Sequence, residues 1–284
     1  NPMLREVRLF YEKEFALGEY ALGMIKQRLN ISLPLDDAAS IALHIVSAEF
    51  DTRVKDTLKI TEFLEDVMEQ IKIGTIAQGS KYKQQLSEYV KYGFETFQLN
   101  WHMELGDANL EKMANDCKEI LGDSGKTITT LGLYCNPLQN ESHFENLKYV
   151  IDSAHLFGAT NVGTFAGALE GEPVEAAIPR FKEVFSELAK RAADKGLKLV
   201  IENCPMHGTW KKATCNIGFC PSAWDLMFDA VPDKNFGLEW EPTHQMVQLI
   251  DPMPQLKKYK DKILHIHGKD ATVDRDAISR NGIL

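Results

Sequence analysis

The chain has 284 residues, of which 44% are hydrophobic and 26% charged, as is usual for a globular protein. A net charge of -9 and a pI near 5.4 argue against a nucleic-acid-binding surface spread over the whole chain. No apolar run approaches the ~20 residues that span a bilayer, and the charged N-terminus does not fit a signal peptide, so we expect a cytoplasmic protein that binds neither membrane nor nucleic acid.

The first seventy residues show a helical hydrophobic pattern. Apolar side chains recur at helical spacing from Phe10 to Leu29, and Pro34 interrupts them. Acidic residues at the start of a second segment suit a helix N-terminus. We therefore predict helices over residues 10–29, 37–50 and 54–70, which together form a helical domain over residues 1–70.

After Ile71, short apolar runs alternate with longer amphipathic segments. Strands are predicted at Lys72–Ala77, Thr96–Leu99, Ile128–Tyr134, Asn161–Phe165, Lys198–Glu202, Phe236–Glu241 and Ile263–His267. Helices are predicted at Tyr82–Tyr92, Leu110–Leu121, Ser142–Phe157, Pro179–Lys195, Pro221–Phe228 and Pro254–Tyr259. Such alternation indicates a parallel sheet, and seven strands in sequence favour a (β/α)8 TIM-type barrel over an open doubly wound sheet. Because the chain stops soon after the seventh strand, we expect the barrel over residues 71–284 to be incomplete at its C-terminus.

Carboxylates and imidazoles gather where the last three predicted strands end. The fifth strand ends at Glu202, the sixth at Glu241 with His244 close behind, and the seventh at His267. Strand alternation puts the two glutamates of E-W-E on one face, and the two histidines of H-I-H on one face. Oxygen and nitrogen ligands of this kind suit Mn²⁺, Mg²⁺, Co²⁺ or Zn²⁺. The alternative for any single one of these residues is a solvated or structural role.

Three motifs resemble the xylose isomerase-like sugar isomerase/epimerase family over about residues 72–284: I-E-N, E-P-T-H and H-I-H-G-K-D. The resemblance implies that Glu202 is both a metal ligand and a catalytic base, and that Glu241 and His267 are further ligands. It also implies that His244 contacts a substrate oxygen. The implied activity is isomerisation or epimerisation of a sugar, by proton transfer next to a metal-polarised carbonyl.

Two departures from the family bear on this expectation. The strand-6 ligand is usually an aspartate, whereas this sequence has Glu241. The family's second catalytic glutamate lies on an eighth strand, beyond the last residue here, so we expect weak metal binding and little turnover. A related barrel endonuclease is a third possibility, which the acidic balance disfavours.

Other residues are weaker candidates for substrate binding or metal binding. Trp101 follows the second strand and would stack on a sugar ring or pack between barrel and helix, and His207 lies in the loop after the fifth strand, where it would cover the site. The five cysteines are odd in number and form no C-x-x-C pair, which indicates reduced thiols. Cys204, Cys215 and Cys220 are close enough for a soft-metal site, although their spacing fits no common zinc pattern.

The N-terminal segment, with its I-A-L-H-I-V stretch, resembles the phosphotransferase-system (PTS) regulatory domain of bacterial transcription antiterminators over about residues 1–70. The match is to part of such a domain. It implies dimerisation through these helices and phosphorylation of His44 by a phosphocarrier protein. The alternative function is therefore a sugar-responsive antiterminator regulatory domain, and the alternative role for His44 is a buried helix residue.

Overall fold

A computed structural model describes residues 7–9, 11–29, 32, 34–35, 37–38, 71–269 and 271–282. The chain divides into two compact units, Asn1–Gly74 with Glu88–Thr96, and Thr75–Ser87 with Phe97–Leu284. The second is called the barrel unit below.

The first unit contains helix α2 (Glu12–Leu29), which confirms the first predicted helix. Phe15 is buried on this helix and packs with Val7 and Ala38. Gly18 permits the backbone of Ala38 to come close, since a Cβ at residue 18 would overlap the Ala38 carbonyl. Beyond Ala38, the two further predicted helices and His44 lie outside the described residues.

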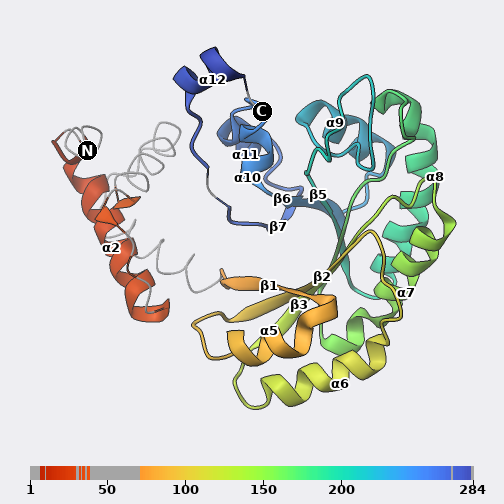
Figure 1. Cartoon of the computed structure of the whole chain (residues 1–284), viewed down its shortest axis with the longest axis horizontal. Coiled ribbons are helices and arrows are strands. Elements are labelled where there is room, and N and C mark those ends of the chain that lie inside the picture. Colours follow the sequence, from red (N-terminus) through yellow and green to blue (C-terminus); the bar gives the residue numbers. More distant parts are fainter. Residues whose placement is uncertain are drawn as a thin grey trace. The chain divides into compact units, whose positions relative to one another are not determined.

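Seven parallel strands form one curled sheet, in the order β1-β2-β3-β4-β5-β6-β7 (Figure 1). They are β1 (Gly74–Gln78), β2 (Thr96–His102), β3 (Thr127–Tyr134), β4 (Asn161–Thr164), β5 (Lys198–Glu202), β6 (Phe236–Trp240) and β7 (Ile263–Ile266). All seven predicted strands are confirmed. Among the described strands β7 does not pair with β1, so the sheet is an incomplete TIM barrel, as the sequence predicts.

Helices follow the strands and cover the outer face of the sheet, as α6, α7 and α8 show in Figure 1. The elements are η1 (Gly79–Lys81), α5 (Tyr82–Tyr89), α6 (Leu110–Leu121), α7 (Glu141–Phe157), α8 (Val174–Ala193), α9 (Pro221–Ala230), α10 (Pro242–Met246), α11 (Pro252–Lys258) and α12 (Arg275–Asn281). The short helices η1, α10 and α12 were not predicted.

The start of α8 corrects a sequence prediction. The helix begins at Val174 and not at Pro179, which lies inside it. A proline marks a first helical position well because it has no N–H to satisfy there. Here the buried side chains of Val174 and Ala177 anchor an earlier turn in the core, which offsets the backbone hydrogen bond that Pro179 cannot donate.

The core of the barrel unit lies between the sheet and its helices. Phe181 and Phe185 of α8 stack with ring centroids 4.4 Å apart, and both pack against Phe236 of β6. All residues of β4 and β6 are buried, as expected for parallel strands covered on both faces. The aromatic cluster thus anchors the N-terminal end of β6 against α8.

The pairing of β6 with β7 contains a register shift between Leu238 and Glu239. After the shift, Glu239 pairs with His265, while on the other side of β6 Glu239 pairs with Glu202 of β5. The ends of β5, β6 and β7 are thereby brought side by side.

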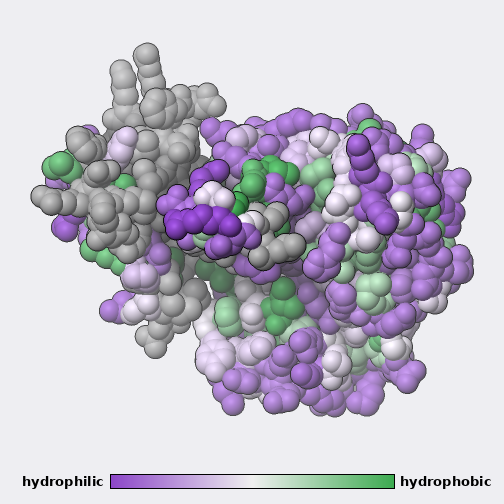
Figure 2. Space-filling model, turned by 45° about the horizontal axis from the view of Figure 1, so that its top comes forward, coloured by the Kyte–Doolittle hydropathy of each residue, from purple (hydrophilic) through white to green (hydrophobic). Residues whose placement is uncertain are grey.

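No helix among the described residues is long and apolar enough to cross a membrane. Figure 2 shows hydrophilic side chains over most of the visible face of the barrel unit, with small separate apolar areas.

Candidate metal and substrate site

Three predicted ligands come together at the C-terminal ends of β5, β6 and β7. Glu202 is the last residue of β5, Glu241 precedes α10 directly after β6, and His267 directly follows β7. One donor atom from each lies within 4.8 Å of the other two. The parallel order of the strands produces this arrangement, because the carboxyl ends of neighbouring strands share one edge.

His267 contacts a different carboxylate with each ring nitrogen. Its Nδ1 lies 3.1 Å from Oε1 of Glu202 and 3.9 Å from Oε2 of Glu241. Its Nε2 lies 3.1 Å from Oε1 of Glu239 and 3.3 Å from Oε1 of Gln98. Burial disfavours the charged imidazolium, but the Glu239 and Glu202 carboxylates outweigh that effect and raise the pKa of His267 to about 10.

Glu241 is almost fully buried and is held through its backbone and its side chain. Asn203, itself fully buried, accepts from the Glu241 N–H at 2.7 Å and donates to the Glu241 carbonyl at 2.9 Å. The Lys269 ammonium and the His244 Nε2 lie 2.8 Å and 3.2 Å from Glu241 Oε1. Since both approach Oε1, Oε2 is left on the side facing His267.

Glu239 is a buried carboxylate that the sequence prediction did not include. Its oxygens contact four side chains: Oε1 lies near Gln98 Nε2, His265 Nδ1 and His267 Nε2, and Oε2 accepts from the Tyr134 hydroxyl. Burial opposes ionisation of Glu239, yet the two histidines hold its pKa well below the usual range. Its position two residues before Glu241, on the same strand face, was the available sequence signal.

Small residues make room for this network. A Cβ at Gly163 of β4 would lie 3.0 Å from both Glu239 Oε2 and the Tyr134 hydroxyl. The Tyr134 hydroxyl is buried and next to Glu239, so burial and that carboxylate raise the pKa of Tyr134 far above its usual value. Tyr134 is therefore a neutral hydrogen-bond donor at the base of the site.

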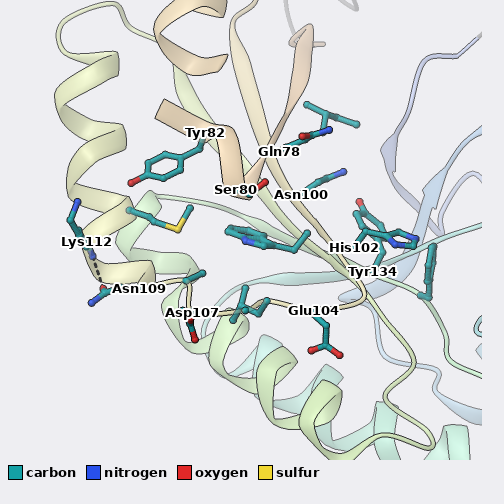
Figure 3. A pocket seen from close by; sticks show the side chains of 18 of the residues that line it. Gln78, Ser80, Tyr82, Asn100, His102, Glu104, Asp107, Asn109, Lys112 and Tyr134 are labelled. Carbon is teal, nitrogen blue, oxygen red and sulfur yellow. Dashed lines mark hydrogen bonds between the residues drawn. The ribbon is translucent and has the colours of Figure 1, made fainter. Parts of the chain in front are cut away.

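A cleft of about 930 Å³ has Glu202, one of the three predicted ligands, in its wall. Trp101 also lines the cleft and is only 7% exposed. Figure 3 shows the polar side chains Gln78, Ser80 and Asn100 in one part of the lining. Glu202 thus belongs both to the ligand cluster and to the cleft, as a ligand that is also a base requires.

The remaining predicted residues differ in their placement. His244 is half-buried beside Glu241, and burial lowers its pKa. His207 is exposed, in a left-handed backbone conformation with φ of 61°, and is not among the described residues that line the cleft. All five cysteines are free. Of the cysteines considered for a soft-metal site, Cys204 joins Glu202 and His244 in a second possible ligand group.

Comparison with known proteins decides the family. The model of the xylose isomerase-like TIM barrel family matches residues 86–282. This chain belongs to that family. A second family model, the PRD domain, matches residues 1–48.

Solved structures share the fold of this xylose isomerase-like barrel at low identity. An L-ribulose 3-epimerase aligns with a TM-score of 0.56 and 15% identity, over 73% of this chain and 75% of its own. A xylose isomerase domain protein from Planctomyces limnophilus aligns with a TM-score of 0.55 and 16% identity, over 70% and 74%. A D-psicose 3-epimerase aligns with a TM-score of 0.55 and 14% identity, over 71% and 77%.

Two curated relatives match the N-terminal part. A β-glucoside operon antiterminator of Dickeya chrysanthemi and the transcription antiterminator LicT of Bacillus subtilis (strain 168) are each 39% identical over 72 residues. That stretch is 25% of this chain, and the chain spans about a quarter of the length of these relatives. The two resemblances seen in the sequence, to the barrel family and to the antiterminator regulatory domain, are both confirmed.

The donor set of this family member fits a divalent ion. Two carboxylates and one imidazole from three strands suit Mn²⁺, Co²⁺, Zn²⁺ or Mg²⁺. The free oxygen of Glu241 and the Nδ1 of His267 are directed to the same side as Glu202. Two neighbours orient these donors: Glu239 contacts the Nε2 of His267, and Asn203 accepts from the Glu241 backbone N–H.

Proposed function

We propose that the barrel unit is a divalent-metal-dependent isomerase or epimerase of a sugar or sugar derivative, with Glu202, Glu241 and His267 as ligands. The observation that carries this proposal is the placement of Glu202 in both the ligand cluster and the wall of the cleft. The epimerase structures that share the fold support the same class of reaction.

The proposed chemistry uses few groups. A bound divalent ion would polarise the substrate carbonyl and its neighbouring hydroxyl, which acidifies the carbon-bound hydrogen between them. Glu202 accepts that proton and returns it. His244, whose Nε2 lies 3.2 Å from Glu241 Oε1 and whose pKa is lowered by burial, donates to a substrate oxygen. Trp101 offers an aromatic surface in the cleft wall.

Hydrogen exchange between substrate and solvent tests whether Glu202 acts as a base, without requiring the complete epimerisation reaction. One carboxylate can remove a proton and return it to the same face, so exchange in D₂O needs no second base. We expect incorporation of deuterium next to the carbonyl of a ketose such as D-fructose, when Mn²⁺ and the chain are both present. Glu202→Gln should abolish it, and Glu119→Gln, an exposed α6 change, should not. Equal exchange by E202Q and the unchanged chain would refute this role.

Metal binding needs its own measurement. Calorimetric titration with Mn²⁺ or Co²⁺ should show one site per chain. His267→Asn removes one of three ligands and should lower the metal affinity of that site at least about ten-fold. A titration without heat of binding at millimolar metal would overturn the metal site.

A second function is supported by the match of residues 1–48 to the PRD domain and by the antiterminator relatives. PRD domains interact with PTS phosphocarrier proteins, so we propose that His44 accepts a phosphoryl group from such a carrier and that the N-terminal helices pair two chains. Incubation with a phosphocarrier that already carries a labelled phosphoryl group should transfer the label to the unchanged chain and not to the His44→Ala variant. Equal labelling of both would refute His44 as the acceptor.

A further inference from the structure

The lining of the cleft indicates which ligands it admits. Its charged side chains are unequally distributed: Glu104, Asp107 and Glu202 are acidic, and Lys112 is the single lysine or arginine among the described lining residues. Figure 3 shows Glu104 and Asp107 together along one part of the cleft. A ligand that carries a phosphate or carboxylate group would approach Asp107 and Glu202, and also Glu104, whose Oε1 lies 3.2 Å from the Nε2 of His143.

The single lysine among the described lining residues is already engaged. The Lys112 ammonium lies 2.9 Å from Oδ2 of Asp116, a residue that also contacts Lys83 and the Tyr82 hydroxyl. His102 packs edge-on against the Phe165 ring, with centroids 6.1 Å apart. The described lining therefore contains no lysine or arginine without a carboxylate partner.

The N-terminus of α6, which borders the cleft, is also occupied. The Asn109 side chain accepts from the Lys112 backbone N–H at 2.9 Å, in the position that an anion would take at a helix start. Glu111 in the first turn and Asp107 just before the helix add negative charge there. The helix start is therefore a poor phosphate site.

The rest of the lining suits neutral hydroxyl groups. Gln78, Ser80 and Asn100 supply amide and hydroxyl groups that both donate and accept hydrogen bonds. Trp101 supplies an aromatic face, and Gly79 keeps it in place: a Cβ at residue 79 would overlap the Trp101 ring. The ring lies against the backbone of η1, so its orientation is set before a ligand binds.

We infer that the cleft accepts an uncharged polyhydroxy compound, such as a free ketose, and rejects its phosphate ester. This inference rests on the proposed function, because it concerns the same cleft. It goes beyond that function by excluding phosphorylated and carboxylated substrates. The lining carboxylates repel a phosphate dianion, most strongly at low salt, and the lack of a lysine or arginine available to pair with it costs further affinity.

Paired ligands test the inference. Binding of D-fructose and D-fructose 6-phosphate, and of D-psicose and its 6-phosphate, is measured by calorimetry on the full chain in EDTA and again with Mn²⁺. We expect the free sugar to bind at least about ten-fold tighter than its ester. The double variant Glu104→Gln/Asp107→Asn should bind the phosphate ester more tightly, which would reduce the ratio of the two dissociation constants several-fold. Asp229→Asn, an exposed carboxylate outside the cleft, is the matched control and should leave the ratio unchanged.

Variants of Trp101 test whether the sugar binds in this cleft. Trp101→Ala should remove free-sugar binding and Trp101→Phe should keep most of it, with thermal unfolding used to confirm that both variants are folded. Tighter binding of the phosphate ester would overturn the inference and leave the proposed reaction standing for sugar phosphates. Binding of neither ligand would also overturn it. Binding of the free sugar without any metal site would overturn the proposed function and support the inference.

Discussion

The Glu239 carboxylate lies 3.1 Å from Nε2 of His267, whose other nitrogen, Nδ1, faces Glu202. A carboxylate that accepts from one imidazole nitrogen fixes the ring and leaves the second lone pair free for a metal. We therefore propose that Glu239 is a positioning residue, which would act on a bound metal through His267.

Glu239→Gln tests this positioning role. The amide keeps the size of the side chain but loses the charge, so we expect metal affinity to fall about 10- to 100-fold while the fold persists. Glu239→Ala should be worse, at a cost of about 3–5 kcal/mol of unfolding free energy, because it leaves buried partners without their carboxylate. Calorimetric metal titration and thermal unfolding measure the two effects. Unchanged metal affinity in a folded Glu239→Gln chain would show that His267 needs no such support.

The pH dependence of stability follows from His267 in the metal-free chain. Its folded pKa of about 10 lies above the ordinary value of 6.5, so the folded state binds more protons between these values. The stabilising contribution is complete below pH 6.5 and is lost as the pH rises through about 10. Denaturant unfolding from pH 6 to 10 should show a declining free energy of unfolding. His267→Gln should flatten that decline, and an equal slope in both chains would contradict the assignment.

Gly163 is predicted to be intolerant of substitution. A Cβ there would lie 3.0 Å from Glu239 Oε2 and from the Tyr134 hydroxyl, in a fully buried region. Gly163→Ala should therefore cost about 1–3 kcal/mol by overpacking, and should weaken metal binding because Glu239 is displaced. Gly268→Ala is the control, since its Cβ would meet no atom within 4 Å. Equal melting temperatures for the two variants would count against this packing.

Asn203 should be needed for the position of Glu241. It bonds to the Glu241 N–H and to the Glu241 carbonyl at once, and Asn203→Ala removes both hydrogen bonds. We expect a loss of roughly 2–4 kcal/mol of unfolding free energy. Asn203→Asp retains the acceptor but not the donor, so its free energy of unfolding should lie between those of the unchanged chain and Asn203→Ala. Chemical denaturation gives the order, and an Asn203→Asp chain less stable than Asn203→Ala would argue against shared hydrogen bonding.

Much of the site was available from the sequence. Glu202, Glu241 and His267 end three successive apolar runs, and strands that alternate with helices must be parallel, so their ends meet at one edge. For the same reason the strands were predicted correctly, while the start of α8 was misplaced, because Pro179 has the local features of a first helical residue.

The residues around those ligands depended on tertiary structure. Gln98 of β2 and Glu239 of β6 are 141 positions apart in sequence, and only the curled sheet places them 3.0 Å from each other. The ion pair of Lys112 with Asp116 and the hydrogen bond of Asn203 to the Glu241 backbone were likewise not predicted from the sequence. The sequence by itself determined the strands, the family and the candidate ligands, because these follow from local periodicity and residue type. The tertiary structure decided which carboxylate holds His267 and which charges remain free in the cleft, because both depend on contacts between distant segments.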